Sequence, residues 1–225
     1  MKKRFLLMGA AVVLLAAAAA GGSLAAGQAS GNAPVTAPLQ APNLTIAFNS
    51  DNGDTEEVDA VFDGVVMPGD EDVVVTDNYS VKNTGSVDSY IRVTVRKYWA
   101  DKETGEKLED LDAGKITLNP NAEGWLEAKS LAALFSAEDS DETQVFYCTS
   151  PVDAGTATAG LLESFDIAAD LSNAYADKAI VLEAVAEGVQ FAGADYNEVN
   201  AAGIKASWGV QVELDENGNI ASVRQ

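Results

Sequence analysis

The 225-residue sequence contains no histidine, and this absence excludes whole classes of function. Serine–histidine and cysteine–histidine catalysis both require an imidazole as general base, so neither can be built from this chain. The zinc sites of metalloproteases also depend on histidine, because zinc rarely binds through carboxylates alone. We therefore expect a protein that has no enzymatic activity.

Cysteine is almost as scarce, since Cys148 is the only one in the sequence. A single thiol cannot form an intramolecular disulfide, so the stability of the fold must come from packing. Cys148 ends the apolar run 145–148. This position predicts a small buried hydrophobic side chain and not a reactive thiol.

The first 26 residues have the pattern of an export signal. The cationic start Lys2-Lys3-Arg4 precedes an uncharged run over 5–20, and small residues follow. This run has about 16 residues, whereas a membrane-spanning helix needs about 20, so cleavage is favoured over a retained anchor. Ser23 and Ala25 fit a small-x-small cleavage site, which places the mature N-terminus near Ala26. We expect a secreted protein, in the extracellular matrix or at the cell surface.

Positive charge is also sparse, with 14 Lys and Arg against 35 Asp and Glu. Removal of the three signal-peptide cations changes the formal charge from −21 to −24. A surface this acidic repels nucleic acid and anionic membranes, and it attracts cations such as calcium. We expect no nucleic-acid partner, contact with a membrane only during export, and at most weak calcium binding with no other cofactor.

Residues 27–42 have the composition of a flexible N-terminal arm. The segment is uncharged, has no apolar period and carries Pro34, Pro38 and Pro42. The pattern changes at residue 43, where Leu44, Ile46 and Phe48 alternate with smaller or polar residues. Such alternation predicts a half-buried strand at the start of a single domain over 43–225.

Short strands separated by turn residues are expected throughout this domain. The clearest period of two lies in 89–99, with Ile91, Val93, Val95 and Trp99 on the inner face and Arg92, Thr94 and Arg96 on the outer face. Together with the strand expected over 72–83, it predicts a hairpin. Further strands are expected at 58–66, 115–118, 143–149, 161–171 and 179–191.

Two short helices are expected, at 128–135 and at 194–207. In the second, Asp195 and Glu198 have capping-box spacing, Gly209 follows as a stop, and 210–214 returns to the sheet. Many short strands with one or two short helices predict a mostly β fold, a jelly-roll-like antiparallel β-sandwich.

Several segments together resemble the TasA/camelysin family of secreted biofilm matrix proteins from Gram-positive bacteria. The segments are the small-residue exit 21–26, the Pro-Gly-Asp turn 68–70, the strand pair 81–93, the aromatic strand at 146–147 with the turn 155–158, and the strand 185–190 followed by 206–209. The resemblance implies export through a dedicated signal peptidase and a jelly-roll subunit of an extracellular fibre. It further implies that subunits polymerise by donating an N-terminal strand to the next subunit, and other matrix proteins are possible partners.

The chain departs from this family in two ways. Some family members carry a metallopeptidase label, but this chain has no histidine to support such an activity. The arm 27–42 also contains prolines, whereas an ideal donor strand lacks them. The metallopeptidase is therefore the least favoured function.

Donation of a strand also has a physical basis that is independent of the family. Leu44, Ile46 and Phe48, tethered by the arm, could complete a neighbouring sheet through main-chain hydrogen bonds and fill its groove. Insertion of this kind does not close on itself, so it produces filaments. In the alternative, the same strand pairs within its own subunit.

The remaining alternative function is a monomeric secreted adhesin or ligand-binding module. Trp99, Trp125, Trp208, Tyr90 and Tyr98 could form its adhesive surface, although aromatic residues in strands more often pack in the core. Carboxylate clusters at 51–57, 70–72, 138–142 and 215–219 could offer oxygen ligands to calcium. None has the spacing of a twelve-residue calcium loop, so solvated turn charges are favoured.

Overall fold

The computed structural model of the chain describes residues 46–50, 53–55, 58–62, 66–74, 79–128 and 141–224. The signal peptide 1–26 with Ser23, Ala25 and Ala26, the arm 27–42 and Leu44 lie outside the described residues. All but the first residue of the helix expected at 128–135 also lies outside them.

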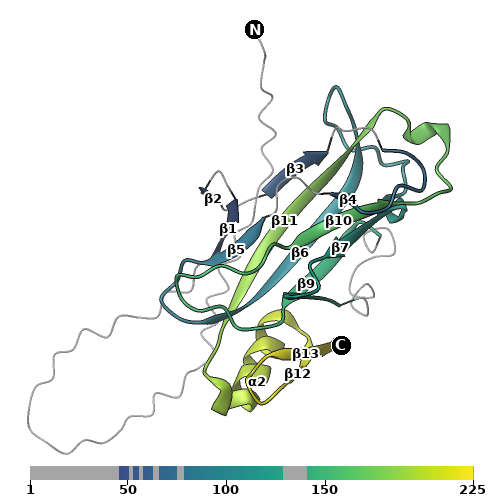
Figure 1. Ribbon diagram of the computed structural model, residues 1–225. Coiled ribbons are helices and arrows are strands. Elements are labelled where there is room, and N and C mark those ends of the chain that lie inside the picture. The colour runs from purple at the N-terminus through teal and green to yellow at the C-terminus, as the bar shows by residue number, and fades with distance from the viewer. Residues whose placement is uncertain are drawn as a thin grey trace, which may run out of the picture.

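A five-stranded antiparallel sheet forms the first layer of the molecule (Figure 1). Its two long strands pair residue for residue, from Ser89 opposite Gln190 to Asp101 opposite Lys178. The sheet therefore has a continuous centre and short outer strands. In order across the sheet, the strands are β3 (Val58–Phe62), β11 (Lys178–Gln190), β6 (Ser89–Asp101), β9 (Thr143–Cys148) and β8 (Trp125–Glu127).

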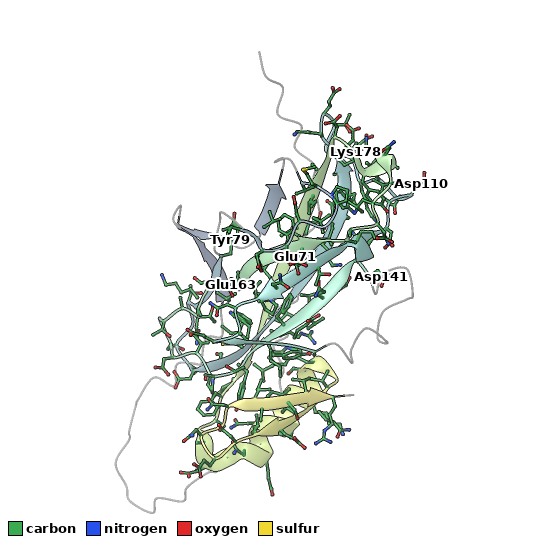
Figure 2. All side chains as sticks on the ribbon, turned by 45° about the vertical axis from the view of Figure 1, so that its right-hand side comes forward. Glu71, Tyr79, Asp110, Asp141, Glu163 and Lys178 are labelled. Carbon is green, nitrogen blue, oxygen red and sulfur yellow. The ribbon has the colours of Figure 1, made fainter. Side chains whose placement is uncertain are left out.

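Two three-stranded sheets join into the second layer. One has the order β2 (Gly53–Thr55), β1 (Ile46–Ser50), β5 (Ser80–Asn83), and the other has the order β4 (Val73–Val74), β10 (Leu162–Ile167), β7 (Ile116–Pro120). The segment that leads into β10 connects them, because the Thr158 N–H donates to the Val81 carbonyl at 2.9 Å and the Leu161 N–H to the Tyr79 carbonyl at 2.8 Å. Tyr79 and Glu163, both labelled in Figure 2, lie at this junction.

The main core lies between the two layers. β6 contributes Ile91, Val93, Val95 and Trp99 to it, as the period of two predicts, and they meet buried residues from β5, β7 and β10. The mostly β, antiparallel sandwich predicted from the sequence is thereby confirmed. The largest buried residues that the other strands and loops bring to this core are Phe165, Phe146, Trp125, Ile116, Leu118, Ile180, Leu182 and Leu161.

A C-terminal unit covers the opposite face of the five-stranded sheet at one end (Figure 1). It consists of the 3₁₀ turn η4 (Ala194–Tyr196), the helix α2 (Asn197–Trp208) and the hairpin of β12 (Gln211–Leu214) with β13 (Ile220–Arg224). The Tyr90 hydroxyl donates to the Gly218 carbonyl at 2.8 Å, and the Trp208 ring packs edge-on against Tyr147. Gly218 has a φ of 82°, and a Cβ there would lie 2.8 Å from the Phe191 ring, so this turn needs glycine.

The hairpin predicted between 72–83 and 89–99 is wrong. β5 pairs with β1, whereas β6 pairs with β11 and β9, so the chain changes layer at the turn 84–88. The physical reason is the buried Asn83 amide, which donates to the carbonyls of Val87 at 2.8 Å and Val152 at 2.9 Å. These bonds turn the chain from the second layer into the first, although Asn-Thr-Gly is also typical of a hairpin loop.

The capping box predicted at Asp195 and Glu198 is also wrong. α2 begins after Tyr196 and has no side-chain cap. The buried Asn200 amide holds the entry to the helix instead, because it accepts from the Ala192 N–H at 2.8 Å and donates to the Gly193 carbonyl at 3.0 Å. The predicted stop at Gly209 is confirmed, with a φ of 71°.

The strand expected over 210–214 does not return to the sandwich sheets. It forms β12 and pairs with β13. The turn between the two strands is closed by Asp215, whose carboxylate accepts from the N–H groups of Asn217 and Asn219, both at 2.8 Å. This local turn gives β12 a nearer partner than the edge of either layer.

Lys97 is the one buried charged residue among the side chains that the structure describes, with an exposed fraction of 4%. Its ammonium donates to the carbonyls of Ile116 at 2.6 Å, Asp141 at 2.7 Å and Ala113 at 2.9 Å. Burial lowers the pKa of Lys97 to about 8, so the ammonium is still the main form at neutral pH. The side chain thus ties the start of β7 and the chain before β9 to the centre of the first layer.

The substitution Lys97→Met is expected to lower the free energy of unfolding by about 3 kcal/mol, because it removes three buried hydrogen bonds from the ammonium to backbone carbonyls. Urea unfolding followed by circular dichroism measures this change. Lys102→Met, at an exposed turn position, is the matched control and should change the value by less than about 0.5 kcal/mol. Equal effects of the two substitutions would contradict the structural role of Lys97.

Candidate assembly edge

The strand singled out from the sequence lies near the border of the second layer. β1 pairs with β5 in antiparallel register, with Ile46 opposite Asn83, Ala47 opposite Lys82, Phe48 opposite Val81 and Asn49 opposite Ser80. On its other side β1 pairs with the three-residue strand β2. The β1–β5 contact therefore spans four residue pairs, against thirteen between β6 and β11.

The register agrees with the alternation seen in the sequence. Val81 and Asn83 are fully buried, whereas Ser80 and Lys82 are half-buried. Directly opposite residues of an antiparallel pair share one face of the sheet. Ile46 and Phe48 therefore occupy the register positions of the buried face. The alternative in which this strand pairs within its own subunit is the arrangement of the structure, and donation to a neighbour stays a prediction.

Asn83 holds the end of β5 in place. Besides its amide bonds to Val87 and Val152, its Oδ1 accepts from the Gly85 N–H at 3.0 Å. Its backbone N–H donates to the Thr156 carbonyl at 2.8 Å, and its carbonyl accepts from Gly155 at 2.8 Å. These bonds leave the β1 side of β5 fixed in position independently of β1. Sequence reasoning placed Asn83 in a hairpin loop and missed this role.

The aromatic residues considered for an adhesive surface pack inside the protein. Trp99, Trp125, Trp208 and Tyr90 are buried. Tyr98 is half-buried, and its hydroxyl donates to Glu183 at 2.8 Å. The interpretation as packing residues is thus confirmed for four of the five.

The outward side chains of β6 form ion pairs across the first layer. Arg92 pairs with Glu187 at 2.5 Å and lies over the Trp208 ring. Arg96 pairs with Glu142 at 3.0 Å, and Lys107 reaches the same carboxylate at 2.7 Å. Burial alone would raise the pKa of Glu142, but the hydrogen bonds from Lys107 and Arg96 outweigh it and lower that pKa. Arg92 and Arg96 are therefore matched by carboxylates and form no anion site.

Two of the acidic clusters act within turns. The Asp70 carboxylate accepts from the Met67 N–H at 2.7 Å. The side-chain and backbone hydrogen bonds from Asn219 hold the pKa of Asp215 below its ordinary value. Side chains at 51–57 and residues 138–140 lie outside the described part of the chain. Among the side chains that the structure describes, no three Cys, Asp or Glu residues gather as a metal would require.

Cys148 is buried within the core, as the sequence predicts. Burial raises the pKa of its thiol to about 11, so the thiolate is scarce at neutral pH. Over the described ranges, no helix is both long enough and apolar enough to span a membrane.

Comparisons of the chain with protein-family models, with curated proteins and with solved structures gave no match.

The thiol of Cys148 is expected to be inert in the folded protein and to react fully once the protein is unfolded, because burial hinders both access and ionisation. Titration with a chromogenic disulfide reagent at about pH 8 measures this difference when it is done on the native protein and on protein unfolded in about 6 M guanidinium. Rapid labelling of the native protein would contradict the packing around β9.

Proposed function

We propose that this protein is a secreted structural subunit that assembles into an extracellular matrix or surface fibre by donor-strand exchange. β1 is the donor, with Ile46 and Phe48 in its alternating pattern and Leu44 before it, and the arm 27–42 is the tether. The resemblance to TasA/camelysin proteins supports this function, and the mostly β, antiparallel sandwich of the structure is compatible with it. The observation that carries it is the position of β1. This short strand lies near the border of the second layer and pairs with β5, which hydrogen bonds to the segment before β10 also hold in place.

A strand in this position suits exchange for an energetic reason. Main-chain hydrogen bonds in a fixed register would be identical within one subunit and between two. Few cross-strand pairs must be broken, because β1 meets β5 over four residues. The second layer retains β5, β4, β10 and β7 when β1 is absent, so a defined acceptor remains.

The negative charge of the subunit makes its assembly depend on the ionic strength of the medium. With a formal charge of −24 after signal removal, copies repel one another at long range. Salt at physiological concentration screens this repulsion over about 8 Å, and divalent cations screen it further. Short-range strand pairing can then dominate. The charge thus favours a subunit that stays soluble until it meets a suitable ionic medium.

Deletion of residues 27–48 is expected to leave a soluble monomeric sandwich that forms no filaments, because both tether and donor are removed. Size-exclusion chromatography and electron microscopy, with and without calcium, measure this outcome. Replacement of Leu44, Ile46 and Phe48 by serine keeps the chain length and should give the same loss. Unchanged filaments in either variant would reject the proposal, whereas a wild-type monomer that binds a matrix ligand would favour the adhesin.

A further inference from the structure

We infer that a ring of three backbone carbonyls around Lys97 is a binding site for a primary ammonium group. The Lys97 side chain fills this site in the folded protein, and a free alkylammonium ion takes its place when the side chain is shortened. The carbonyls belong to Ala113, Ile116 and Asp141. The inference is independent of the proposed function, because it concerns how the sandwich is closed and not how copies assemble.

The contacts of the Lys97 ammonium are those of a filled binding site. A lysine ammonium carries three N–H donors, and here each meets one carbonyl oxygen, at 2.6, 2.7 and 2.9 Å. These N···O distances are typical of charge-assisted hydrogen bonds. The ring therefore matches a nitrogen that bears a positive charge and three N–H groups.

The Ala113 side of the ring is held by bonds that do not involve the ammonium. This carbonyl begins the 3₁₀ turn η1 (Ala113–Lys115), which Asp112 caps by accepting from the Gly114 N–H at 2.7 Å. The Asp112 carbonyl in turn accepts from the Trp99 indole N–H at 3.1 Å. The turn thus keeps its shape without the Lys97 side chain.

The other two carbonyls are also fixed by the main chain. Ile116 begins β7 and lies opposite Ile167 of β10. Asp141, labelled in Figure 2, directly precedes Glu142, whose carbonyl accepts from the backbone N–H of Lys97 at 2.8 Å. Because the backbone holds all three oxygens, a shorter side chain at position 97 leaves an ordered site.

Nearby charges favour a cation in this site. Burial opposes the charged form of Lys97 and lowers its pKa, whereas the negative charges of four carboxylates act in the opposite direction. These carboxylates belong to Asp141, Asp112, Glu127 and Glu142. Calcium takes about six to eight oxygen ligands, and the ring offers three among the described residues, so an ammonium group is the expected occupant.

The Lys97 ammonium therefore has the role of a built-in structural cation. It joins β6 of the first layer to the start of β7 in the second layer and to the chain before β9. Because it is covalently attached, the site is filled at any concentration of free cations. We expect the stability of the wild type not to depend on alkylammonium ions, although the acidic surface attracts cations in general.

The variant Lys97→Ala with n-propylammonium as the probe tests the inference. The substitution removes the side chain beyond Cβ, and n-propylammonium supplies the lost atoms one for one. Lys97→Met is the matched control, because its apolar side chain fills the same path. Sodium chloride and tetramethylammonium chloride at equal concentration control for ionic strength and for a cation without N–H donors. Urea unfolding followed by circular dichroism measures the folding equilibrium constant.

The folding constant of Lys97→Ala is expected to rise in proportion to 1 + [L]/Kd, which is about tenfold when the n-propylammonium concentration is about nine times its Kd. The wild type and Lys97→Met should respond to this probe no more than to sodium chloride. An equal response of Lys97→Ala to all three salts would overturn the inference. So would a Lys97→Ala chain that stays unfolded when n-propylammonium is added.

The wild type provides a second measurement that needs no substitution. In ¹⁵N-resolved NMR spectra of lysine ammonium groups, the Lys97 hydrogens should exchange slowly with water, because they are buried and hydrogen-bonded. Lys102, at an exposed turn position, is the internal control and should exchange rapidly. Equally rapid exchange at Lys97 in the native protein would also overturn the inference.

Discussion

The antiparallel pairing of β6 with β11 is the interaction on which the rest of the molecule depends. The two strands match along their full length of thirteen residues, and they carry apolar or ion-paired side chains on both faces. One face builds the main core with the second layer, and the other receives the C-terminal unit through Tyr90 and Val189. β11 and β6 also have a partner strand on each of their edges, with β3 beside β11 and β9 beside β6, so free main-chain hydrogen-bonding groups lie at the borders of the sheet. Any association through main-chain pairing must therefore occur at a short outer strand.

The second layer meets this requirement through β1 and β5. Its centre is stabilised by hydrogen bonds that do not involve β1, and the Asn83 corner fixes the strand on which β1 lies. Under the proposed function, β5 is the acceptor and β1 is the strand that copies exchange. In this proposal, the acidic surface opposes exchange at long range and the β1–β5 register favours it at contact.

The sequence predicts those parts of the fold that local periodicity determines. Alternation in 89–99 identifies β6 and its two faces, and Gly209 marks the end of α2. Pairing between distant strands is not a local property, so the hairpin expected at Asn83 was wrong. Asn83 and Lys97 act through carbonyls up to 69 residues away in the sequence, and no pattern in a single chain reveals such partners. For the candidate site, the alternating apolar residues of the proposed donor strand can be recognised in the sequence. The identity of its partner strand, β5, follows only from the order of strands in the folded sheet.

The central claim is that β1 of one subunit lies on β5 of another in the filament. Solid-state NMR of filaments grown from an equal mixture of ¹³C-labelled and ¹⁵N-labelled monomers tests it most directly, because cross-peaks then arise only between different subunits. The account predicts intermolecular cross-peaks between Ala47 and Lys82 and between Phe48 and Val81. Filaments in which these cross-peaks occur only with uniformly double-labelled monomers would contradict it.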